Sequence, residues 1–224
     1  MERPIPPPIP YIHQRDTVTL TVGAIVSNAF SIGFSNFWNI AGATILYLIT
    51  IWIPYLNIGT SIAMSSGIII SLSKGDMFKP TDIFKPGYRK FMGEYFILSG
   101  LIVIGVYMGL ALVVIPGIVL GLAWSLSCII LIDKDVTPLE ALKLSNKMTD
   151  GFKWTLFGAT IIIVLIFGAI AALGFFLIQN VSPVSFAVAA GIISIVYCVV
   201  FYGASAYIYR TLHNRLEPAE EDTE

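Results

Sequence analysis

The chain has 224 residues, of which 56% are hydrophobic and only 12% are charged, and its mean hydropathy is +0.83. Soluble domains carry about 25% charged residues, so this composition excludes an ordinary water-soluble globular domain. The net charge of −1 gives no overall field that would attract nucleic acid, and no nucleic-acid partner is expected.

The first 16 residues, MERPIPPPIPYIHQRD, predict a proline-rich extended arm. They lack the basic segment followed directly by an apolar core that defines a secretory signal. Residues 211–224 contain LEPAEEDTE and predict an acidic, disordered tail. Residues 17–210 between them are expected to form a single domain. Cys128 and Cys198 both lie in apolar runs, which favours buried hydrophobic residues over a disulfide.

All 13 Lys and Arg residues lie outside three uncharged stretches, Thr17–Ser73, Tyr95–Ile132 and Trp154–Tyr209. The last two are each long enough for two spans of about 20 residues. Proline, glycine or polar residues interrupt all three stretches, within WIPYLNIGTS, VVIPGIVL and LIQNVSPVS. The pattern predicts an all-α integral membrane protein with six transmembrane helices in three hairpins, at about 38–73, 93–133 and 154–209.

The basic residues would then all lie on one membrane face, which the positive-inside rule makes cytoplasmic. We therefore expect a multi-pass protein of the inner membrane with both termini in the cytoplasm. Gly59–Ser73, the expected second helix, has only about 15 residues, or roughly 22 Å of helix against a hydrocarbon core of about 30 Å. Whether the first hairpin spans the membrane or is re-entrant stays open.

Two stretches resemble each other: SNAFSIGFSNFWNIAGATIL from Ser27 and SNKMTDGFKWTLFGATII from Ser145. A fainter third copy is DIFKPGYRKFMGEYFILSG. These copies predict an internal repeat whose unit is an interfacial amphipathic helix, an aromatic anchor and a hairpin. The alternative is a chance similarity between apolar sequences that contain glycine and aromatic residues. The interfacial helices are expected at about 17–35 and 138–148, the second with a capping box formed by Thr137 and Glu140. The expected interfacial anchors are Trp38, Phe91, Phe152 and Trp154.

Three segments carry a family resemblance: SLSKGDMFKPTDIFKPGYRKF, IPGI, and LIDKDVTPLEALKLSNKMTDGFKWTLFG. From about Val18 to Tyr209 the chain resembles uncharacterised bacterial six-span membrane families related to the integral membrane domain of some glycerophosphoryl diester phosphodiesterases. In those enzymes the hydrolase is a separate soluble barrel, and nothing in this chain matches it. The resemblance implies a helical membrane module and supplies no catalytic residue.

Few residues suggest catalysis. His13 and His213 lie in the terminal arms, Asp133 and Asp135 are best explained as a charge cluster at a helix end, and Glu94 as a membrane-edge carboxylate. No catalytic, metal-binding or phosphate-binding motif is present, so no enzyme activity, metal or cofactor is expected. The predicted spans contain no internal ionisable residue, which argues against a coupled pump or antiporter.

Two groups of residues are candidate sites. The possible pore-lining residues of the second helix are Asn57, Thr60, Ser61, Ser65 and Ser66. The alternative for that helix is a packing face of small residues at Gly59, Ala63 and Gly67. The pairs Gly105–Gly109 and Gly117–Gly121 predict close helix crossings, within the bundle or between protomers.

The second candidate site is a basic loop that could contact anionic lipid or a partner, formed by Lys74, Lys79, Lys85, Arg89 and Lys90. The alternative is a topology signal without a ligand. These observations favour a non-enzymatic membrane-organising, accessory or scaffold module. Its expected partners are membrane lipids, especially anionic ones, and a second copy or another cytoplasmic or membrane protein. The alternative is an uncoupled channel or transporter for a small or amphipathic solute.

Overall fold

The structure is a computed structural model that describes residues 19–178 and 183–213, and over these residues it is helical and contains no strand. The α-helices are α1 (Val22–Ser35), α2 (Phe37–Thr50), α3 (Pro54–Ile62), α4 (Ile68–Lys74), α5 (Met92–Leu112), α6 (Val114–Ala123), α7 (Ser127–Lys134), α8 (Pro138–Thr149), α9 (Lys153–Ile178) and α10 (Pro183–His213). A π-helical segment, η1 (Ala63–Gly67), joins α3 to α4 without a break. Two 3-10 segments, η2 (Pro80–Phe84) and η3 (Pro86–Phe91), connect α4 to α5. The predicted all-α class is confirmed.

Five helical segments are long and apolar enough to cross a membrane: Pro54–Lys74, Pro86–Leu112, Val114–Lys134, Lys153–Leu177 and Val184–His213. A sixth span requires α1 and α2 to act as one segment, although they are bent by 77° relative to each other. These findings fit a multi-pass helical membrane protein. Six spans remain a prediction that depends on this bent pair.

The expectation that the second helix is short was wrong. That helix starts at Pro54 and runs for 21 residues through α3, η1 and α4. The short element is α2, whose 14 residues extend about 21 Å at 1.5 Å per residue. Pro54 occupies the first turn of α3, where the missing N–H costs no hydrogen bond, so it starts the helix and does not separate two helices. Pro116 likewise lies in the first turn of α6, and the chain reverses earlier, at the extended residue Val113.

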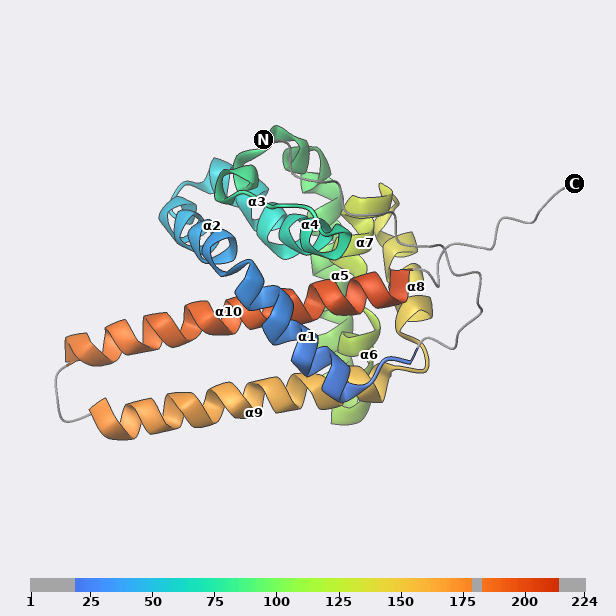
Figure 1. The fold of residues 1–224 in the computed structure, drawn as a ribbon. Coiled ribbons are helices and arrows are strands. Elements are labelled where there is room, and N and C mark those ends of the chain that lie inside the picture. The colour runs from blue at the N-terminus through green and yellow to red at the C-terminus, as the bar shows by residue number, and fades with distance from the viewer. Residues whose placement is uncertain (1–18, 179–182, 214–224) are drawn as a thin grey trace, which may run out of the picture.

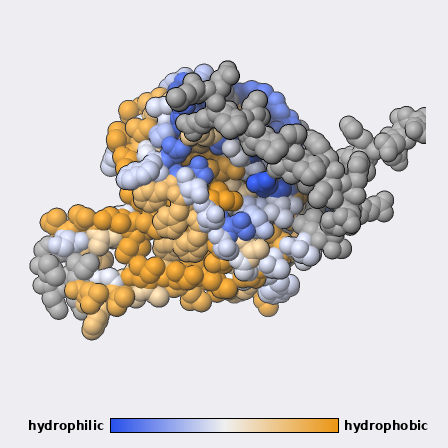
Figure 2. Space-filling view, in the orientation of Figure 1, coloured by the Kyte–Doolittle hydropathy of each residue, from blue (hydrophilic) through white to orange (hydrophobic). Residues whose placement is uncertain are grey.

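The arrangement of the hairpins differs from three parallel pairs. Figure 1 shows the α9–α10 hairpin projecting from the rest of the molecule, with α5 and α6 running across its direction. Helix α1 lies against α10 and also contacts α9. In a bundle of parallel hairpins, this side of α9 and α10 would pack against another hairpin, but here α1 covers it. In Figure 2 hydrophobic residues cover the projecting hairpin, and hydrophilic residues gather toward the opposite side of the molecule.

The contact between α1 and α10 is a glycine crossing. A Cβ on Gly33 would lie 2.6 Å from the carbonyl oxygen of Val199, and a Cβ on Gly203 would collide with the carbonyl oxygen of Ala29. Ile25 and Ala29 are fully buried there. The predicted apolar face of residues 17–35 therefore packs on protein. Gly33 lies inside α1, and the chain breaks three residues later at Asn36.

The predicted close crossing of the two glycine pairs is found within the chain. A Cβ on Gly109 would lie 2.9 Å from the Cα of Gly117, and one on Gly105 would collide with the ring of Trp124. Small residues on both sides of the turn thus allow α5 and α6 to approach closely.

Helix α8 begins and ends close to the predicted bounds. The Thr137 hydroxyl accepts a hydrogen bond from the Glu140 backbone N–H at 3.4 Å, which is one half of the predicted capping box. The inner face of α8 is buried within the protein, so at most its outer face is available to a headgroup layer. The buried residues are Ala141, Leu142, Ser145, Met148 and Thr149.

The internal repeat remains a hypothesis. Both copies fold locally as helix, short break and helix, namely α1–α2 and α8–α9. The equivalent glycines nevertheless have different neighbours, because Gly42 faces Pro80 while Gly158 faces Val22.

Candidate functional site

The basic loop is largely paired with acidic and aromatic side chains of the same chain. Lys74 Nζ lies 2.5 Å from Asp133 Oδ1, and Lys90 Nζ lies 2.5 Å from Asp135 Oδ2. Lys85 pairs with Asp82 at 3.2 Å, and the Arg89 guanidinium lies 4.8 Å from the centre of the Tyr55 ring. The first two pairs give the predicted charge cluster at Asp133 and Asp135 a role, because each carboxylate neutralises one lysine of the basic loop.

Asp133 is the centre of a polar node that joins three helices. Its side chain is only 6% exposed and accepts a second hydrogen bond, from the Tyr209 hydroxyl at 2.7 Å. The node therefore connects the end of α4, the end of α7 and the last turns of α10. A buried carboxylate needs such partners, because an unpaired charge in this position would cost several kcal/mol. The sequence pattern did not indicate Tyr209, whose partner is 76 residues away.

The connection between α4 and α5 folds back over α2, α3 and η1. Cβ atoms on Gly42 and Gly59 would touch the side chains of Pro80 and Arg89, and one on Gly67 would collide with Tyr88. Phe78 is 2% exposed and therefore points into the protein. Of the five residues of the basic loop, the structure thus brings Arg89 against α3 and leaves the Lys74, Lys85 and Lys90 side chains more than half exposed beside their partners.

The hydroxyl groups of the second helix form two small hydrogen-bond networks. Ser61 donates to Asn57 Oδ1 at 2.9 Å and lies 3.2 Å from the Tyr47 hydroxyl of α2. The Tyr95 hydroxyl of α5 donates to Ser65 Oγ at 2.9 Å. These bonds link α3 and η1 to the helices on either side. Tyr47 and Tyr95 are the partners that the helical spacing alone could not identify.

The other two predicted pore-lining residues, Thr60 and Ser66, are buried. Ser66 is fully buried with its hydroxyl 3.3 Å from that of Ser65, and Thr60 donates to the backbone oxygen of Leu56 at 3.1 Å. Ile62 and Ile69 fill the interior around them, at 0% and 3% exposed. The predicted pore-lining residues are therefore brought together, in an arrangement that packs helices against one another.

One side of this network opens to the surface. Asn57, Ser61 and Tyr95 line a groove of about 680 Å³ between α3 and the start of α5, whose other walls include Ile58 and Phe96. The π-helical segment η1 follows immediately, and π-helical insertions are frequent at functional sites. In this groove, polar residues of the second helix meet an open hollow on the surface.

A second polar feature lies at the interruption between α6 and α7, within a candidate span. The Ser145 hydroxyl of α8 donates to the Ala123 carbonyl at 2.7 Å and accepts from the Leu126 N–H at 3.3 Å. The Thr149 hydroxyl lies 3.5 Å from the same carbonyl. Side chains of α8 thus provide hydrogen-bond partners for the Ala123 carbonyl and the Leu126 N–H at the interruption.

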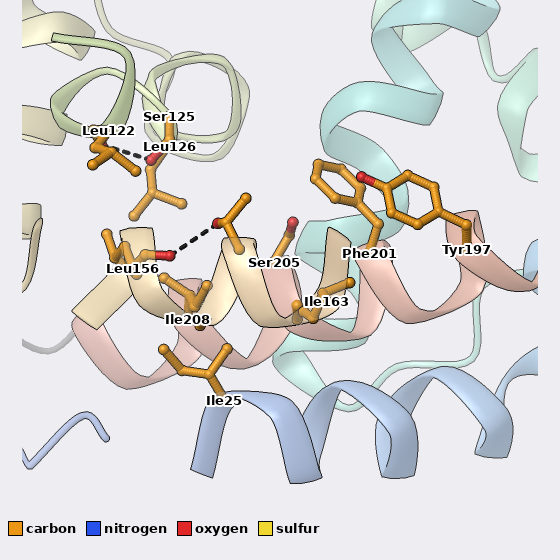
Figure 3. A pocket seen from close by; sticks show the side chains of 13 residues that line it. Ile25, Leu122, Ser125, Leu126, Leu156, Ile163, Tyr197, Phe201, Ser205 and Ile208 are labelled. Carbon is orange, nitrogen blue, oxygen red and sulfur yellow. Dashed lines mark hydrogen bonds between the residues drawn. The ribbon is translucent and has the colours of Figure 1, made fainter. Parts of the chain in front are cut away.

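A cavity of about 120 Å³ lies beside this interruption, between α1, α6, α9 and α10. Figure 3 shows Ile25 of α1 and Ser125 of the interruption on opposite sides of it, with Ser205 between them. Ser125 and Thr160 donate to backbone oxygens of their own segments, at 2.8 and 2.9 Å. Because a water molecule needs about 10–15 Å³ of cavity volume, this cavity has room for several waters or a short alkyl segment.

The expected aromatic anchors divide into two pairs. Trp38 and Trp154 are 82% and 73% exposed, whereas Phe91 and Phe152 are half-buried. Over the described residues, no group of His, Cys, Asp and Glu side chains is placed to hold a metal ion. His13, in the N-terminal arm, lies outside the described residues, as do residues 214–224 of the acidic tail.

Comparison of the chain with protein-family models, curated proteins and solved structures gave no match in any of the three.

Proposed function

We propose that this protein is a non-enzymatic, multi-pass membrane module with a structural role, as a membrane-organising, accessory or scaffold component. The observation that carries the proposal is the use of the hydroxyl-rich helix. Its serines bond to one another and to Tyr47 and Tyr95, while Ile62 and Ile69 close the interior. A water path would need those hydroxyl groups to face a continuous opening.

The partners in this proposal are lipids and another protein. The exposed face of α9 and α10 is apolar, with Leu165 and Leu173 65% and 60% exposed, and suits the hydrocarbon interior of a bilayer. The basic residues, from Lys74 to Lys90, would face the cytoplasmic surface of the inner membrane, with both termini on that side. Because Asp82, Asp133 and Asp135 neutralise three of the lysines, attraction of the basic loop to anionic lipid is weaker than its composition suggests.

The resemblance to the membrane domains of glycerophosphoryl diester phosphodiesterases agrees with a helical accessory module and remains an expectation. The second candidate function is an uncoupled channel or transporter. The cavity beside the α6–α7 interruption favours it, because interrupted helices with satisfied backbone groups often border solute sites.

Flux through reconstituted liposomes distinguishes the two functions. Liposomes loaded with a small-ion indicator or a neutral osmolyte should leak no faster with the protein than without it. Leakage that rises with protein content would favour permeation. In that case two variants would show which region conducts. Ser65→Leu places a bulky apolar side chain among the hydroxyl groups of the helix Pro54–Lys74, and Ser205→Leu fills the cavity beside the α6–α7 interruption.

A further inference from the structure

An apolar groove lies between α6 and α9 and shares one wall residue, Leu122, with the cavity beside the α6–α7 interruption. It has a volume of about 330 Å³. Its walls are Ile115, Ile118, Val119 and Leu122 of α6 and Lys153, Trp154 and Phe157 of α9. Trp154 is 73% exposed and meets the Phe157 ring edge to face at 5.9 Å between ring centres, so the aromatic wall stands open to the surroundings.

The groove has a charged rim at one end. The Lys153 side chain lines the groove, and its Nζ lies 3.5 Å from Asp150 Oδ1. Asp150 is 79% exposed, whereas Lys153 is 23% exposed. A cation and an anion therefore stand together where an apolar groove begins, directly before the uncharged length of α9.

We propose that this groove binds one bilayer phospholipid whose head group carries a primary ammonium, such as phosphoethanolamine. An acyl chain lies along the α6 wall, the phosphate pairs with Lys153, and the ammonium pairs with Asp150. Trp154 holds the glycerol region, at the depth where tryptophan is enriched in membrane proteins. The two charges decide the head group, because a net negative head group would meet the exposed carboxylate of Asp150 as well as the lysine.

The site does not depend on the structural function proposed above, since a channel could carry the same lipid. It also differs from the basic loop, where Lys74, Lys85 and Lys90 pair with Asp133, Asp82 and Asp135.

The test uses the full chain, delipidated in detergent. The substitutions Trp38→Phe, Trp52→Phe and Trp124→Phe leave Trp154 as the single tryptophan. Quenching of Trp154 fluorescence is titrated with brominated phosphatidylethanolamine, phosphatidylglycerol and a brominated fatty-acid methyl ester. The variants are Lys153→Gln, Asp150→Asn and Val119→Trp, the last read by lipid retention in native mass spectrometry because it adds a second indole. Lys147→Gln, an exposed lysine of α8 outside the groove, is the control.

The ethanolamine lipid should bind most tightly. Lys153→Gln should weaken it about fivefold, the factor that one lysine near a lipid surface supplies. Asp150→Asn should remove the preference over phosphatidylglycerol, Val119→Trp should abolish retention, and Lys147→Gln should change neither. Equal quenching by the methyl ester would overturn the proposal, as would binding that survives both Lys153→Gln and Val119→Trp. Tighter binding of phosphatidylglycerol than phosphatidylethanolamine would refute the assigned head group.

Discussion

Replacing Gly203 by alanine should push α1 away from α10. The new Cβ would collide with the carbonyl oxygen of Ala29 and lie 2.8 Å from the Gly33 backbone nitrogen. Both atoms belong to a helix backbone and cannot rotate aside, so the two helices must separate. Overpacking of this kind costs about 1–3 kcal/mol, which exceeds the roughly 0.5–1 kcal/mol that alanine gains over glycine within a helix.

The matched control is Gly191→Ala in the same helix, where an added Cβ would meet nothing within 4 Å. Unfolding of both variants in detergent, followed by circular dichroism during a thermal or denaturant titration, measures the difference. Gly203→Ala should lower the free energy of unfolding, and Gly191→Ala should leave it unchanged or raise it slightly. If the two variants are equally stable, the glycine crossing does not hold α1 on α10.

Three further substitutions test the polar contacts. Asp133→Asn removes the carboxylate between Lys74 and Tyr209 and should cost about 1–3 kcal/mol, whereas Asp135→Asn, in an exposed pair, should cost under about 1 kcal/mol in the same titration. Ser145→Ala leaves the Ala123 carbonyl and the Leu126 N–H with fewer partners and should lower the free energy of unfolding by about 1–3 kcal/mol. If the loss is no larger than that of Asn146→Ala, a substitution at an exposed position of the same helix, α8 does not support the interruption. Tyr95→Phe removes the bond to Ser65 and should cost about 1 kcal/mol, and accelerated hydrogen exchange confined to α3, η1 and the start of α5 would locate that loss.

Local signals in the sequence were reliable where short-range physics decides the structure. The absence of charges identified the apolar segments, the Thr137 cap predicted the start of α8, and the glycine pairs predicted the α5–α6 crossing. Each of these depends on residues within one helix or one hairpin.

Prolines near the hairpin turns were harder to interpret, because proline fits both a turn and the first turn of a helix. Pro54 and Pro116 were expected to separate helices, yet each lies in the first turn of a helix. That ambiguity shifted the short element of the first hairpin from α2 to its neighbour.

Long-range partners could not be predicted from spacing. Asp133 bonds to Tyr209, which is 76 residues away, and Gly33 of α1 faces Val199 of α10. Helical periodicity shows that a residue lies on the inner face of its helix, but it does not show which helix faces it. The same limit applies to the hydroxyl-rich helix, where the pattern left pore and packing open and the positions of Tyr47 and Tyr95 favour packing.

We propose that the module crosses the membrane six times with its basic side in the cytoplasm. The five long segments alone would place the two termini on opposite faces, and the bent pair α1–α2 restores them to one face if it crosses. Reporter fusions that are active on only one side of the inner membrane, placed after Gln14 and after Leu216, measure this directly. Six spans predict a cytoplasmic signal from both fusions. A periplasmic signal from the Gln14 fusion together with a cytoplasmic one from the Leu216 fusion would show that α1 and α2 do not cross, and would contradict the six-span architecture.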